Sequence, residues 1–277
     1  MPFDSPQSSR VPVGSTSFDN LTMAQTVGRI VEMTSNKSGR TQLVCTGNLD
    51  HLVLLSKDDD FKKIYDCADL VVADGEPVIW LSKISARKLG VPPLCERVAG
   101  SDLFWELGRA SAETALKIFL LGGSPGAADS ARDAVIRKYP NAQIVGTYCP
   151  PFETFGTPAE QSLILSKVAE ANPDVLMVAF GAPKQEKWID QNKFVLGVPV
   201  AIGVGGSFEM AAGVVKRAPQ WMRRTGTEWF FRFLQEPTRL WDRYFKNDMP
   251  FLLSLAIRTA VAPPAPRDTS PTHEQPS

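Results

Sequence analysis

Two patterns of apolar residues alternate along the middle of the chain. Short apolar runs rich in Val, Ile and Leu, each closed by a turn-forming residue, are typical of buried parallel strands. Longer segments in which apolar residues recur every three to four positions are typical of amphipathic helices. The predicted strands span residues 41–46, 69–73, 117–121, 142–147, 174–180 and 199–203. The predicted helices span residues 22–34, 49–66, 76–87, 101–114, 125–139, 158–171, 184–193 and 206–213.

This alternation predicts the α/β fold class, with a Rossmann-like, mostly parallel sheet and helices on both of its faces. We expect residues 18–215 to form this α/β domain. The two ends of the chain differ from it in composition. Residues 1–17 are rich in Ser, Pro and Gly, and residues 263–277 form a polar, Pro-rich tail. Such segments bury too little apolar surface to fold, so we expect both to be disordered.

The character of the chain changes from residue 216. Residues 216–262 are rich in aromatic side chains and carry nine Lys or Arg against four acidic residues, a net charge of +5. A basic, aromatic and helical C-terminal appendage is typical of a segment that lies on an anionic membrane surface. A helical pair packed on the sheet fits the same composition equally well. The apolar stretch at 249–262 is too short to span a bilayer, and the N-terminus lacks a signal-peptide pattern.

Composition narrows the classes of function. The formal net charge is zero at pH 7, so no overall basic field predicts binding to nucleic acid. The two histidines, His51 and His273, are too few for most zinc sites and for a Ser-His-Asp triad. Four cysteines without a C-x-x-C pair favour buried, reduced thiols of a cytoplasmic protein. The acidic run at 58–60 predicts a helix cap, and we expect neither a metal nor another cofactor.

Asp74 directly follows the apolar run at 70–73, which predicts a buried parallel strand. The carboxyl end of such a strand faces the ligand crevice of an α/β sheet, where a carboxylate is placed for chemistry. The alternative is an N-cap for the helix that follows, because Asp readily accepts hydrogen bonds from free backbone N–H groups. Spacing alone favours the cap.

Polar groups and glycines follow other predicted strands. Thr46 closes the first predicted strand and Asn48 follows it; both suit hydroxyl or phosphate groups, although either residue could cap the next helix. Gly122 and Gly123 come between the third strand and a helix, where a phosphate could approach the backbone closely. This turn matches neither the full dinucleotide fingerprint nor a Walker loop, so its signal is weak.

The longest polar region joins two adjacent strand-to-helix turns. Lys184 and Gln185 begin one helix, and the glycines at 203, 205 and 206 with Ser207 form the next turn. Exposed N–H groups from two turns, together with a lysine, make a credible cradle for a diphosphate. Close packing of helix on strand is the alternative reason for the glycines.

Seven ordered blocks of sequence resemble the WecG/TagA/CpsF glycosyltransferases, glycosyltransferase family 26. The blocks are TGNLDH, ADLVVADGEPVIW, ERVAGSDL, FLLGGSPGAA, FGAPKQEKWI, GVGGSFEMAAG and KRAPQWM with EWFFRFLQEPTRLWDRY, and the match around them runs from about residue 20 to 246. The resemblance implies an inverting enzyme of bacterial cell-surface polysaccharide synthesis. It implies transfer of an N-acetylmannosamine-type sugar or a hexose from a UDP-sugar to a polyprenyl-diphosphate-linked sugar. It further implies a peripheral location on the cytoplasmic face of the membrane.

The resemblance also assigns roles to residues that match the family's motifs. Asp74 falls at the catalytic base, and Thr46, Asn48 and Gln185 fall on the polar pocket around it. One departure is Gly47, where related sequences often carry Pro. The candidate substrate-binding residues, from both lines of reasoning, are Gly122, Gly123, Lys184, Gly203, Gly205, Gly206, Ser207, Arg97, Arg232, Arg239 and Arg243.

A nucleotide-dependent oxidoreductase on a Rossmann-type sheet is the main alternative function. It requires GxGxxG after the first strand, whereas this chain has the tripeptide TGN at 46–48. The partners that the resemblance implies are a UDP-sugar, a lipid-linked acceptor and the cytoplasmic membrane surface, and we expect no nucleic acid. An exposed apolar face on the appendage could also pair with a second subunit, which leaves a homo-oligomer open.

Overall fold

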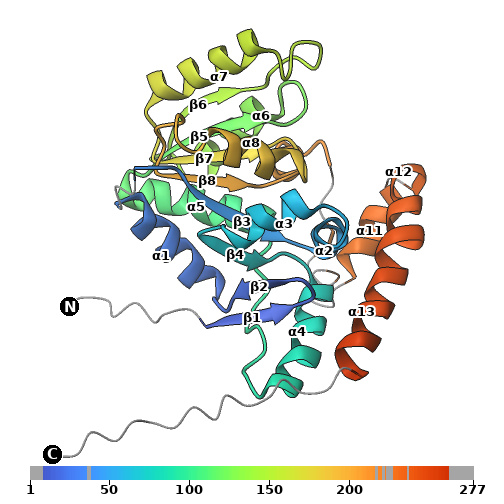
Figure 1. Ribbon diagram of the computed structural model, residues 1–277. Helices are drawn as coiled ribbons and strands as arrows, with labels where there is room; N and C mark the ends of the chain where they lie inside the picture. Colours follow the sequence, from blue (N-terminus) through green and yellow to red (C-terminus); the bar gives the residue numbers. More distant parts are fainter. Residues whose placement is uncertain are drawn as a thin grey trace, which may run out of the picture.

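The computed structural model describes residues 9–35, 39–215, 218–219, 222, 227–235 and 237–261. Its centre is a six-stranded sheet in the order β4-β3-β8-β7-β5-β6, in which every neighbouring pair is parallel (Figure 1). The predicted α/β fold class is confirmed. The strands are β3 (Gln42–Gly47), β4 (Leu70–Ala73), β5 (Lys117–Gly122), β6 (Gln143–Tyr148), β7 (Val175–Ala179) and β8 (Val200–Gly203).

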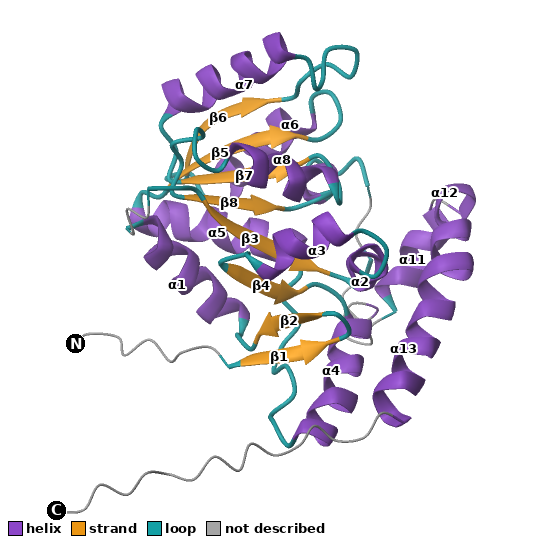
Figure 2. Cartoon of the chain, viewed as in Figure 1, coloured by secondary structure: helices purple, strands orange, loops and turns teal. Residues whose placement is uncertain are grey.

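Helices cover both faces of this sheet (Figure 2). Successive strand residues point to opposite faces and feed two separate apolar cores, so the strands read as continuous apolar runs. One core packs against α2 (Leu49–Leu55), α3 (Asp59–Asp66), α7 (Pro158–Ala171) and α8 (Lys184–Asn192). The other core packs against α1 (Met23–Thr34), α5 (Gly100–Thr114), α6 (Ala127–Lys138) and α9 (Ser207–Ala211).

An N-terminal hairpin corrects the expectation that residues 1–17 are disordered. The strands β1 (Arg10–Val13) and β2 (Thr16–Asp19) pair antiparallel, and Val11, Val13 and Phe18 are buried in the core. The hairpin lies beside β4, where Asp19 Oδ2 accepts a hydrogen bond of 2.8 Å from the backbone N–H of Val71. Buried and exposed residues alternate in β1, so the segment forms a strand although the residues around it are rich in Ser, Pro and Gly. Residues 1–8 and the tail at 263–277 lie outside the described residues.

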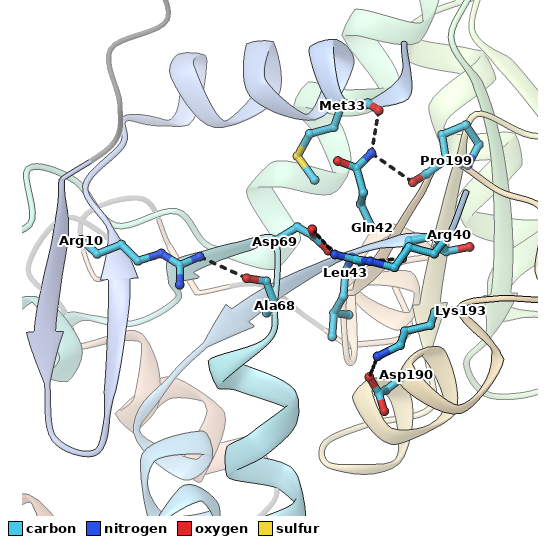
Figure 3. A network of polar contacts seen from close by, with 11 residues as sticks. Arg10, Met33, Arg40, Gln42, Leu43, Ala68, Asp69, Asp190, Lys193 and Pro199 are labelled. Atoms are coloured by element: carbon cyan, nitrogen blue, oxygen red, sulfur yellow. Dashed lines mark hydrogen bonds and ion pairs between the residues drawn. The ribbon is translucent and has the colours of Figure 1, made fainter. Parts of the chain in front are cut away.

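Ion pairs and hydrogen bonds close the amino edge of the sheet (Figure 3). The guanidinium of Arg40 binds both carboxylate oxygens of Asp69, at 2.7 and 2.8 Å, and Asp69 also accepts from the N–H of Leu43. The side-chain amide of Gln42 donates to the carbonyl of Met33 at 2.8 Å. These contacts fix the starts of β3 and β4, and the side chains of Arg40, Asp69 and Gln42 are hydrogen-bonded within the protein. In a parallel sheet of this kind, ligands are expected at the opposite, carboxyl edge.

The C-terminal appendage is helical, as predicted, and packs on the α/β body. Its elements contact α2 and α4 (Glu76–Leu89), and Lys88 Nζ donates to the carbonyl of Thr259 at 2.6 Å. Several of its apolar side chains nevertheless remain more than 40% exposed: Phe230, Leu234, Trp241, Phe245, Leu253 and Ile257. None of the helices within the described residues has the length and apolarity needed to cross a bilayer. The elements are α11 (Glu228–Gln235), α12 (Pro237–Trp241), η1 (Asp242–Asp248) and α13 (Met249–Val261).

Candidate active site

Asp74 lies where β4 ends, beside the end of β3, because Gly47 pairs with Ala73 in the parallel register. Its carboxylate oxygen Oδ2 accepts a hydrogen bond of 3.1 Å from the N–H of Gly100, the first residue of α5. The following helix, α4, begins after Gly75 without a side-chain cap. The capping alternative therefore holds in a changed form, since Asp74 binds the N-terminus of α5 rather than of α4. The positive end of the α5 dipole favours the ionised carboxylate.

Thr46 occupies the neighbouring position on β3. It is buried, and its Oγ1 donates to the carbonyl of Gly203 at 2.9 Å, which links the ends of β3 and β8. A Cβ placed on Gly100 would lie 3.3 Å from Thr46 Oγ1 and 3.6 Å from Asp74 Oδ2. Thr46, Asp74 and the start of α5 thus meet at one point, and glycine permits the close approach.

Asn48 is the N-cap of α2, which is the structural alternative considered for it. Its Oδ1 accepts a hydrogen bond of 3.2 Å from the N–H of His51 and thereby begins α2. This contact orients the side chain beside the Asp74 turn, since the Cβ of Asn48 lies 3.8 Å from the Cβ position of Gly75. Asn48 is therefore near the candidate base, but its side-chain oxygen already accepts a hydrogen bond from the first turn of α2.

Arg97 connects the candidate base to the appendage. Its Nη1 donates to Glu228 Oε2 at 3.0 Å, while Asp102 and Glu76 lie 3.8 and 4.0 Å from other guanidinium nitrogens. Burial opposes the charge on Arg97, but the hydrogen bond to Glu228 and the charge of Asp74 raise its pKa overall. One arginine is therefore surrounded by four carboxylates, and a diphosphate would compete with Glu228 for it.

Gln185 is buried next to the turns that follow β7 and β8. Its Oε1 accepts from the N–H of Gly181 at 3.2 Å and from the N–H of Gly205 at 3.1 Å. Its Nε2 donates to Oε1 of Glu186 at 2.7 Å. The side chain of Glu186 is fully buried, and this burial raises its pKa to about 7. Gly203 must lack a side chain, because a Cβ there would lie 2.5 Å from Gln185 Nε2.

The glycine turn after β5 has the character of a packing turn. A Cβ on Gly122 would lie 2.8 Å from the ring of Phe180. The N–H of Gly123 donates to the carbonyl of Ala179 at 2.9 Å, and the N–H of Ser124 donates to Glu209 Oε1 at 2.7 Å. The N–H groups of Gly123 and Ser124 are thus engaged inside the protein, and close packing against Phe180 gives a structural reason for Gly122.

The remaining predicted residues divide by exposure. Lys184 and Gly206 are exposed at the carboxyl edge, where a ligand could reach them. Ser207 is buried, and its Oγ donates to the carbonyl of Val204 at 2.6 Å. The appendage arginines predicted to bind substrate lie on α11, α12 and η1, but their side chains are outside the described part of the structure: Arg232, Arg239 and Arg243.

Three residues that contact the candidate site residues were not identified from the sequence. Gly100 lies in the block ERVAGSDL, but only the fold shows that its N–H reaches Asp74. Glu186 follows Gln185 directly, and no sequence pattern indicates that it is buried. Glu228 lies more than a hundred residues from Arg97 in the chain, so nothing local signals their contact.

Within the described residues, no three His, Cys, Asp or Glu side chains gather closely enough to hold a metal ion. The acidic run behaves as predicted, since Asp58 caps α3 by accepting from the N–H of Phe61 at 2.9 Å. The four cysteines are free, but Cys67 and Cys95 are exposed, contrary to the expectation that all are buried.

Comparison with known proteins places the chain among glycosyltransferases. The model of the Glycosyl transferase WecG/TagA/CpsF family matches residues 11–264, and the chain belongs to this family. The resemblance seen in its sequence blocks is thereby confirmed, and the family assignment favours a transferase over an oxidoreductase.

Three similar proteins carry the same name. The N-acetylglucosaminyldiphosphoundecaprenol N-acetyl-beta-D-mannosaminyltransferase of Bacillus subtilis (strain 168) is 32% identical over 201 residues, 73% of this chain and 74% of the relative. Proteins of the same name from Staphylococcus aureus (strain MW2) and Bacillus spizizenii (strain ATCC 23059 / NRRL B-14472 / W23) are each 29% identical. They cover 83% and 78% of this chain and 87% and 78% of their own lengths, respectively.

Proposed function

We propose that this protein transfers an N-acetylmannosamine-type sugar from a UDP-sugar to N-acetylglucosamine linked to a polyprenyl diphosphate, with inversion at the anomeric carbon. The names of the relatives support the transferred sugar and the acceptor. The observation that carries the proposal is the position of Asp74. Its carboxylate lies at the carboxyl edge of a parallel sheet, beside a buried hydroxyl and a helix N-terminus.

Asp74 acts as the general base in this mechanism. It removes the proton from a hydroxyl of the acceptor sugar as that oxygen attacks the anomeric carbon of the donor. The new C–O bond forms as the bond to the β-phosphate oxygen breaks, and UDP leaves from the opposite face, which inverts the centre. The N–H of Gly100 and the charge of Arg97 both favour the ionised carboxylate that this step needs.

The leaving diphosphate requires positive charge. Arg97 is a described cation whose charge interacts with that of Asp74, and Lys184 adds an exposed ammonium at the same edge. The arginines carried by the appendage helices are further candidates, because Glu228 brings the start of α11 to Arg97. Preorganised charges of this kind stabilise the negative charge that develops on a leaving group.

The appendage brings the enzyme to the membrane in this proposal. Its exposed apolar side chains and its basic sequence suit the surface of an anionic bilayer on the cytoplasmic side, where the lipid-linked acceptor would be found. Truncation before residue 216 should abolish co-sedimentation with anionic liposomes and most of the transfer activity. Equal co-sedimentation of the two proteins would contradict the membrane role, and light scattering would show whether the same face instead pairs two subunits.

The decisive experiment is a transfer assay with a panel of UDP-sugars and an acceptor carrying N-acetylglucosamine on a polyprenyl diphosphate. We expect release of UDP and a lipid product longer by one N-acetylmannosamine. The variant Asp74→Asn keeps an acceptor for the N–H of Gly100 but loses basicity, so turnover should fall by about 100-fold to 10,000-fold. Asp133→Asn, on the exposed face of α6, is the matched control. Near-normal turnover of Asp74→Asn would remove the base assignment.

A further inference from the structure

Glu186 is a buried carboxyl group that the proposed mechanism does not use. It lies in the first turn of α8, just beyond the end of β7, and no part of it is exposed. Burial of a carboxyl group is costly unless its oxygens find partners. One oxygen, Oε1, accepts from Gln185, whereas Oε2 has no hydrogen-bond partner among the described residues. A group retained at this cost needs a function.

The contact to Gln185 determines which way the amide of that residue points. An amide has a donating end and an accepting end, and only the carbonyl oxygen can accept from backbone N–H groups. Here Oε1 accepts from both Gly181 and Gly205, which belong to the turns after β7 and β8. A reversed amide would point its NH₂ group at two N–H donors. Glu186 opposes that reversal, because its carboxylate can only accept a hydrogen bond and so requires the donating Nε2 of Gln185 beside it.

The two turns are joined to the candidate base. The turn after β8 includes Gly203, whose carbonyl accepts from Thr46 Oγ1 at 2.9 Å. Thr46 in turn borders Gly100, the residue whose N–H binds Asp74. A continuous set of short contacts therefore runs from Glu186 through Gln185 and the glycine turns to the carboxyl edge of β3 and β4.

We propose that Glu186 is a positioning residue for sugar transfer: its carboxylate orients the amide of Gln185, and that amide holds the turns after β7 and β8 in place. This inference rests on the proposed function. The ionised carboxylate makes the stronger hydrogen bond, because a charged acceptor strengthens an N–H···O contact roughly twofold over a neutral one. The hold on Gln185 therefore tightens as Glu186 loses its proton.

The groups around Glu186 leave it as a carboxyl that titrates near neutral pH. Cys45 on β3 and Tyr65 on α3 face it, and burial raises the pKa of both, so they stay neutral. Tyr65 contacts the ring of His51 on α2. On its own helix, Lys187 is paired with Asp58 at 2.6 Å, and Asp190 is paired with Lys193 at 2.7 Å.

The test compares the wild type with Glu186→Gln, which keeps an acceptor oxygen but does not titrate, and Glu186→Leu, which has no acceptor. Glu170→Gln, on the exposed face of α7, is the matched control. Transfer rates are measured from pH 6 to pH 8 on the full chain. Amide hydrogen exchange of peptides covering 179–186 and 203–208 is measured on the same proteins by mass spectrometry.

With a pKa of about 7 for Glu186, the wild-type rate should rise about 10-fold over this pH range. The rise should be absent in Glu186→Gln and present in Glu170→Gln; because His51 is retained in every variant, its titration cannot produce that difference. Glu186→Leu should lose exchange protection at Gly181 and Gly205 and lose about 10-fold to 100-fold in kcat.

Parallel pH profiles for the wild type and Glu186→Gln would overturn the proposal, as would full exchange protection in Glu186→Leu. If Glu186→Leu does not fold, the pH comparison with Glu186→Gln still decides. A wild type without transfer activity would contradict the proposed function instead, and the exchange data would then judge the positioning role alone.

Discussion

The same buried carboxyl group should make the stability of the fold depend on pH in a direction opposite to that of most acidic residues. Glu186 is fully buried, and its pKa rises from 4.5 to about 7 in the folded protein. Between these two values the folded chain binds more protons at this site than the unfolded chain does. The free energy of unfolding must therefore fall as the pH rises through this window, and the contribution is constant above it.

The size of the effect follows from the shift. A difference of about 2.5 pKa units corresponds to about 3 kcal/mol at full ionisation, since each unit is worth about 1.4 kcal/mol. At pH 5 the carboxyl is largely protonated when folded and the cost is about 0.8 kcal/mol, whereas at pH 8 it approaches its limit. Between pH 5 and pH 8, the wild type should lose about 2.5 kcal/mol relative to a variant without this titration.

Glu186→Gln is that variant, and urea unfolding at pH 5, 6, 7 and 8 is the assay. Any constant difference between the two proteins cancels, because only the change of their difference with pH is compared. The denaturant slope should stay the same in both, so that the shift in midpoint reports stability alone. Stability curves that run parallel across this range would show that the folded carboxyl is already ionised at pH 5, and the buried, protonatable site would then be refuted.

Two further substitutions probe the neighbouring contacts. Gly203→Ala should destabilise the fold by about 1–3 kcal/mol, because its Cβ would lie 2.5 Å from Gln185 Nε2; Gly28→Ala, in α1 with open space around it, should instead stabilise by about 0.5–1 kcal/mol. Chemical unfolding of both variants checks the contrast, and equal effects would contradict it. Glu228→Gln should tighten UDP binding by about 5-fold in titration calorimetry, because one charged competitor for Arg97 is removed; unchanged affinity would separate Arg97 from the diphosphate.

The sheet could be predicted because each of its strands is buried on both faces and therefore reads as a short apolar run. Helix ends were predictable where the capping residue is close in sequence, as at Asp58, which accepts from the N–H of Phe61. The same cap begins α3 and divides the single helix expected at 49–66 into α2 and α3. The hairpin β1–β2 could not be predicted in the same way. Its strands are short, and their burial depends on contacts with β4 that lie far away in sequence.

The candidate site was predictable only in part, for a related reason. Asp74 follows β4 and Thr46 lies near the end of β3, and these strands are consecutive in the chain and paired in the sheet, so the convergence of the two residues follows from parallel pairing. Gln185 and Gly203 reach the same place because β8 pairs with β3, a strand order that no local pattern encodes. The burial of Gln185 could not be read from the sequence either, because its amide completes the hydrogen bonding of two backbone turns that come together only in the fold.

The two edges of the sheet differ in how their charges balance, and this difference supports the proposal that the appendage contributes to the site. At the amino edge Arg40 meets Asp69 in a bidentate pair, so positive and negative charge cancel locally. At the carboxyl edge Arg97 faces Glu76, Asp102, Glu228 and Asp74, which leaves the described cluster with an excess of negative charge. A substrate that carries a diphosphate would be repelled by that excess unless further cations approach it. The sequence supplies arginines on the helix that Glu228 begins and on the two elements that follow it, so the body of the enzyme and its appendage are complementary in charge.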